Sequence, residues 1–298
     1  MTSRASRRHR AARSRGNPAP APALVPRTVG EAADAMEREA EALAAKALPA
    51  TYPREGPRSV AIAFGHRGLA LWRGHRHALQ GPSLAAANTI MRALAELPIT
   101  VGWIWLRPDV HLELWQAEYA RLRIAQHSGY RNSWAATISG LQSKPDTIAT
   151  YQQVVDDARA LLKREEEAGR PVRNLGRASL LPSIESRVQQ LANAGMTSYR
   201  DTYELVHRYH SEWVHAGGGS FLRVIESEDA QIFNDERPGD DLAVPRMESV
   251  GLLLALIGLV NQIADLGVHD RWQTVMGHYI DHTMAFVERF KEMMATGA

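Results

Sequence analysis

Residues 84–106 read LAAANTIMRALAELPITVGWIWL, and this stretch decides the fold class. Its apolar residues are denser than those of a surface helix, and the stretch is longer than a strand. We therefore predict a long core helix that Pro98 kinks. Its only charged residues are Arg92 and Glu96, which are neighbours on one helix face at a spacing of four. Buried charges need partners, so we expect this pair to be partly buried and bound to other polar groups.

Helical patterns continue on both sides of this stretch. The segment Thr28-Val-Gly-Glu31 is a capping box that begins a helix ending near residue 48. Residues 59–79 could begin as a strand, but their later apolar spacing favours a helix. The remaining helices are predicted at about 109–128, 147–168, 181–193, 197–215, 246–266 and 268–294. We therefore predict an all-α, multi-helix bundle with one short extended or hairpin insert near 221–244.

The domain organisation follows from composition. Residues 1–27 hold seven arginines, no acidic residue and several prolines, so we predict a disordered basic, Pro/Ala-rich tail before a single helical domain at 28–298. That domain carries 28 basic and 33 acidic residues, which leaves the tail as the only predicted contact for nucleic acid. The chain has no cysteine, which excludes disulfides, thiolate metal sites and cysteine nucleophiles.

The expected location is the cytoplasm. The longest uninterrupted apolar run, residues 250–260, has 11 residues, which is shorter than the 18 or so that predict a transmembrane helix. We interpret it as a core helix and expect no membrane partner. The N-terminal arginines are not followed by the apolar region of a signal peptide, so we do not expect export.

The densest ionisable cluster lies at 199–215. On an α-helical wheel, one stripe holds Asp201, Glu204, Arg208, Ser211, Glu212 and His215. Arg208 and His215 fit the Arg-x(4–6)-His spacing of metal-independent HEPN-type ribonucleases, whose paired residues act at a dimer interface. The chain holds five pairs with this spacing, and about four are expected by chance, so the spacing alone is weak evidence.

Three other interpretations of this cluster stay open. The first is a metal site, because Glu212 and His215 have the Glu-x-x-His spacing of di-iron bundles and His278 with His282 forms an imidazole pair. A di-iron bundle needs a second Glu-x-x-His motif on another helix, but the other such motif, residues 204–207, lies on the same helix. We therefore predict no metal and no cofactor. Ser211 beside His215 suggests a nucleophile, although no strand-turn-helix elbow accompanies it. The fourth interpretation is a solvated ladder of charges along the helix surface.

A family resemblance rests on two of these motifs. The sequence Ser211-Glu-Trp-Val-His215, which follows Tyr203 and Tyr209, together with Arg92-Ala-Leu-Ala-Glu96, resembles the bacterial domain-of-unknown-function family 5677 over about residues 60–290. The resemblance implies a helical fold with a polar centre and implies no reaction, because that family has no assigned activity. Ala216-Gly-Gly-Gly219 stands where small polar residues or proline more commonly follow the histidine.

These observations give two functional hypotheses. The first is a cytoplasmic, self-associating helical interaction or regulatory module, in which Arg92, Glu96, Ser211 and His215 meet between two packed helices. The second is a HEPN-like ribonuclease that uses Arg208 and His215. The candidate catalytic residues are His215, Arg208 and Ser211. The candidate ligand-binding or structural polar centre consists of Arg92, Glu96, Glu212 and Tyr209.

Overall fold

The computed structural model describes residues 28–52, 56–81, 84–130, 145–172, 175, 179–208 and 242–296. These residues form nine α-helices and one short π-helix, so the predicted all-α class is confirmed for this part of the chain. The elements are α1 (Val29–Ala47), α2 (Pro57–Leu79), α3 (Leu84–Leu106), α4 (Pro108–Tyr130), α6 (Pro145–Glu167), α7 (Ile184–Asn193), α8 (Ser198–Asp201), the π-helix η1 (Thr202–Arg208), α11 (Ala243–Ala264) and α12 (His269–Thr296).

Local sequence signals explain several helix boundaries. Thr28 caps α1, and its hydroxyl accepts a hydrogen bond from the Glu31 backbone N–H at 3.1 Å. Pro57 begins α2 at a position where its missing N–H costs nothing. The preference for a helix over a strand at 59–79 is therefore confirmed. Ser183 likewise caps α7 through the backbone N–H of Ser186.

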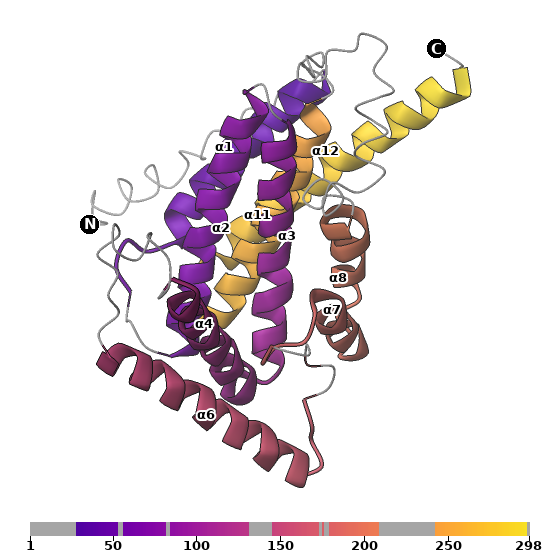
Figure 1. The fold of residues 1–298 in the computed structure, drawn as a ribbon. Coiled ribbons are helices and arrows are strands. Elements are labelled where there is room, and N and C mark those ends of the chain that lie inside the picture. Colours follow the sequence, from indigo (N-terminus) through magenta and orange to yellow (C-terminus); the bar gives the residue numbers. More distant parts are fainter. Residues whose placement is uncertain are drawn as a thin grey trace, which may run out of the picture.

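Helix α11 forms the centre of the bundle. It packs against α1, α2, α3 and α12, and in Figure 1 it lies behind α2 and α3. Its apolar residues surround the whole helix, which is the pattern of a buried core helix. By length and composition it is also the one described helix apolar enough to cross a membrane, but most of its apolar window is buried inside the protein. The interpretation of residues 250–260 as core is confirmed.

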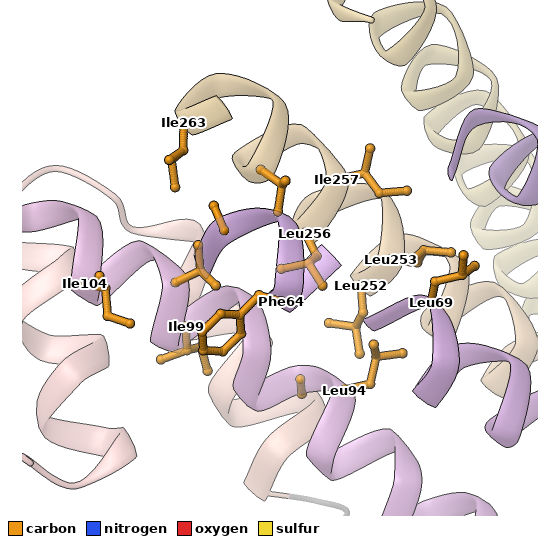
Figure 2. Packing of buried hydrophobic residues seen from close by; sticks show 14 of the residues in the cluster. Phe64, Leu69, Leu94, Ile99, Ile104, Leu252, Leu253, Leu256, Ile257 and Ile263 are labelled. Carbon is orange, nitrogen blue, oxygen red and sulfur yellow. The ribbon is translucent and has the colours of Figure 1, made fainter. Parts of the chain in front are cut away.

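The core lies where α2, α3 and α11 meet. Figure 2 shows Phe64 of α2, Leu94 and Ile99 of α3, and Leu256 of α11 directed into one apolar cluster. The helices approach closely because Gly68 has no side chain, and a Cβ at that position would lie 2.2 Å from Leu256 Cδ2. Close packing of this kind supplies most of the stability of a helical protein.

The remaining helices lie around this core. Helix α6 packs against α4 at one end of the molecule, while α7 and η1 pack on α3 (Figure 1). The predicted tail at 1–27 lies outside the described residues. Most of the predicted extended insert, residues 221–241, also lies outside them, and its last two residues, Ala243 and Val244, belong to α11.

Candidate functional site

The structure describes only part of the predicted polar centre. Arg92 and Glu96 lie on α3, with side chains that are 24% and 35% exposed, so the expected partial burial is confirmed. Tyr209, Ser211, Glu212 and His215 lie outside the described residues. Arg208 is the last residue of η1, and its side chain is likewise not described.

Glu96 connects α3 to η1. Its Oε1 lies 2.9 Å from His207 Nε2 and 3.3 Å from Arg92 Nε. A carboxylate oxygen can only accept a hydrogen bond, so the His207 Nε2 carries the proton that is donated to it. The His207 ring is buried and stacks on Tyr203, with ring centroids 5.3 Å apart. The histidine that meets Glu96 among the described residues is therefore His207.

The segment that carries His207 is a π-helix, in which backbone hydrogen bonds join residues five apart. The α-helical wheel used for residues 199–215 assumes 100° per residue, and this assumption is wrong from Thr202 to Arg208. A π-turn holds more residues than an α-turn, so the residues of η1 are rotated relative to the expected stripe. The one-sided arrangement of Asp201, Glu204 and Arg208 does not follow from the sequence alone.

A second contact extends the polar centre along α3. Arg187 of α7 donates from Nη1 to Thr100 Oγ1 at 3.1 Å and from Nε to the Pro182 carbonyl at 3.0 Å. Its guanidinium also lies over the Trp103 ring, 5.4 Å from the centroid. We call the set Arg92, Glu96, Thr100, Arg187 and His207 the α3 polar seam. Its α3 members are spaced by four residues and so share one helix face.

Burial and charge set the protonation of the seam. Burial would raise the pKa of Glu96, but the hydrogen bond with His207 and the positive charges of His207, Arg92 and Arg187 lower it below its ordinary value. Burial lowers the pKa of Arg187, and the charges of Glu96 and Glu118 oppose this shift. Glu96 is therefore ionised at neutral pH, and the seam joins one carboxylate to guanidinium and imidazole groups.

His111 caps the C-terminal end of α3, next to the seam. Its Nδ1 donates to the Trp103 carbonyl at 2.7 Å, and its ring stacks on Trp103 with centroids 3.9 Å apart. The carbonyl is one of the last four of α3, which have no partner in the regular helical pattern. Burial lowers the pKa of His111 to about 4, although the Trp103 carbonyl opposes this shift. His111 is therefore neutral at physiological pH.

A cavity of about 570 Å³ lies on another side of α3. It is bounded by α3, α8, the start of η1, α11 and α12. The lining residues are Pro98, Ser198, Tyr199, Thr202, Ala255, Gly258, Leu259, Asn261, Gln262, His269, Trp272 and Met276. Tyr199 approaches α3 at Gly102, where a Cβ would lie 2.9 Å from its hydroxyl, and burial raises the pKa of Tyr199 to about 12.

The described residues do not gather metal ligands. Within the ranges given above, no group of three or more histidine or acidic side chains is placed to hold a metal ion. His278, which the sequence pairs with His282, contacts Glu39 of α1 instead, with Nδ1 and Oε2 2.9 Å apart.

Three members of the seam were missed by sequence reasoning. His207 belongs to a Glu-x-x-His motif, whose spacing suggests a metal ligand and gives no indication of a contact with Glu96. Thr100 completes a four-residue spacing with Arg92 and Glu96, and this spacing could have indicated it. Arg187 is 87 residues from its Thr100 partner, and no local pattern predicts such a contact.

Comparison with protein-family models, curated proteins and solved structures finds no match to this chain. The resemblance to family 5677 and to HEPN-type ribonucleases therefore stays a prediction.

Proposed function

We propose that this protein is a helical interaction or regulatory module whose α3 polar seam fixes the register of the packed helices. One observation carries the proposal: Glu96 Oε1 is shared by Arg92 and His207 inside one subunit. A carboxylate held this way links α3 to η1 and has less capacity left for a substrate. Hydrogen bonds that involve charged groups each contribute about 1.5–3 kcal/mol, which is enough to favour one packing arrangement.

Arg187 supports the same proposal. Its side chain is buried and donates hydrogen bonds to a backbone carbonyl and to a threonine hydroxyl of the same chain. Buried polar contacts of this kind serve helix register more directly than catalysis, because an arginine that stabilises a reacting phosphate must face the substrate. The proposal includes a cytoplasmic location and self-association, with any nucleic-acid contact made through the basic tail.

The ribonuclease hypothesis is the alternative outcome of a single test. The purified full chain, without added metal and in the presence of EDTA, is incubated with a fluorescently labelled single-stranded RNA. We expect wild type, His215→Ala and Arg208→Ala to give the same background cleavage, because the proposed module has no nuclease centre. Thermal melting of each variant shows that it is folded. RNA cleavage by wild type that both folded variants lose would overturn the proposal and establish the ribonuclease.

A further inference from the structure

We propose that the cavity between α8, α11 and α12 is a binding site in its own right and that it takes a small, uncharged aromatic molecule. This inference goes beyond the proposed function and does not depend on the α3 polar seam.

The size and the lining of the cavity indicate the class of ligand. Its volume of about 570 Å³ lies within the 300–1,000 Å³ that is usual for small-molecule sites. Among the lining residues that the structure describes there is no aspartate, glutamate, lysine or arginine, in a chain of which 23% is charged. An ionic ligand would lose part of its hydration there, and no described carboxylate, ammonium or guanidinium group of the lining would offset that loss, so the site favours an uncharged ligand.

A fixed aromatic wall favours a flat ligand. The Trp272 indole Nε1 donates to the Leu254 carbonyl at 2.7 Å, which holds the ring against α11. The ring fits there because Gly258 has no side chain, and a Cβ at that position would lie 2.5 Å from Trp272 Cε2. His269 lies beside this ring at 6.3 Å between centroids, with 25° between the planes. Because the Trp272 ring is already held in place, it loses little side-chain entropy when the ring of a ligand packs on it.

Polar groups supply hydrogen bonds at the cavity edge. Ser198 and Gln262 line it from opposite sides, on α8 and α11, and both are exposed. Neither side chain hydrogen-bonds to another residue within the described ranges, so a hydroxyl donor and an amide are available to a ligand. The floor between them has space over the small Ala255, whereas the Trp272 ring occupies the space next to Gly258. The ligand therefore has an apolar ring and at least one neutral polar group.

Two fluorescent dyes test the proposal because they differ by a single charged group. N-phenyl-1-naphthylamine is uncharged, and 8-anilino-1-naphthalenesulfonate carries one sulfonate on a closely similar ring system. We expect the uncharged dye to bind the full chain at one site, with a Kd at least tenfold lower than that of the sulfonate. Ala255→Phe, which fills the floor from an exposed position, is expected to weaken binding of the uncharged dye at least tenfold.

Matched variants keep the result interpretable. Ala160→Phe makes the same change at an exposed position of α6, which packs against α4, and should leave the affinity within twofold of wild type. Ser198→Phe fills the cavity from α8 and replaces Ala255→Phe if that variant melts at a lower temperature. Equal affinity for the two dyes, absence of binding, or unchanged binding in a folded cavity-filling variant would each overturn the proposal.

Discussion

Replacement of Glu37 by alanine is expected to lower the free energy of unfolding by about 3–5 kcal/mol, the range typical of breaking a buried ion pair. The Glu37 side chain on α1 is 4% exposed and accepts two hydrogen bonds from Arg246 of α11, each at 2.9 Å. Arg76 of α2 contributes a third contact at 3.1 Å. Without Glu37, both guanidinium groups lose their shared buried partner while remaining charged, and the partners that they keep, Asp34 for Arg246 and Glu41 for Arg76, are 55% and 40% exposed.

A neighbouring acidic residue provides the control. Glu41, one helical turn further along α1, pairs with Arg73 and Arg76 but is 40% exposed. Exposed ion pairs contribute about 0–1 kcal/mol, so Glu41→Ala should cost no more than that. Urea denaturation of wild type and both variants gives the comparison. Equal costs for Glu37→Ala and Glu41→Ala would show that the contacts of Glu37 with Arg76 and Arg246 are not an important link among α1, α2 and α11.

The second large effect is a loss of stability in weak acid because of His111. Its pKa is about 4 in the folded protein, against an ordinary value of 6.5. Between these values the unfolded chain binds a proton that the folded chain does not, so stability rises with pH. The contribution is complete above pH 6.5 and is lost as the pH falls towards 4. At about 1.4 kcal/mol per pKa unit, His111 accounts for a change of about 3 kcal/mol.

Urea denaturation at a series of pH values from 7.5 to 4 measures this slope. His111→Asn removes the titrating ring and retains an N–H donor for the Trp103 carbonyl, so it should flatten the dependence on pH in this window. His77→Asn changes an exposed histidine on α2 and should leave the slope as in wild type. A slope that is the same in wild type and His111→Asn would contradict a buried, neutral His111.

The helices were predictable because their signals are local. Helix α3 has the predicted bounds, since an apolar run of this length between Gly81-Pro82 and Pro108 has few other solutions. The Thr28 cap and the apolar surface of α11 can likewise be predicted from residues that are close together in the sequence. A partly buried Arg92–Glu96 pair also followed from two charges four residues apart in an apolar helix.

The seam partners depend on tertiary packing. Glu96 and His207 are 111 residues apart in the sequence, so no local pattern indicates their contact. His207 also lies in a π-helical segment, in which an α-helical wheel does not predict which residues face α3. The motif that resembles family 5677 indicates His215 instead. Similarly, Glu37 and Arg246 are more than 200 positions apart, and the acidic pattern of α1 alone resembles an ordinary solvated face.

Whether the α3 polar seam holds the helices together can be measured by a double-mutant cycle on Glu96 and His207. The exposed pair Glu39 and His278 has the same N···O distance of 2.9 Å and serves as the matched cycle. We measure unfolding in urea for each single and double alanine variant. We expect a coupling of about 1–3 kcal/mol for Glu96 and His207, against less than about 0.5 kcal/mol for the exposed pair. A Glu96–His207 coupling no larger than that of Glu39 and His278 would show that the seam does not hold the helices together.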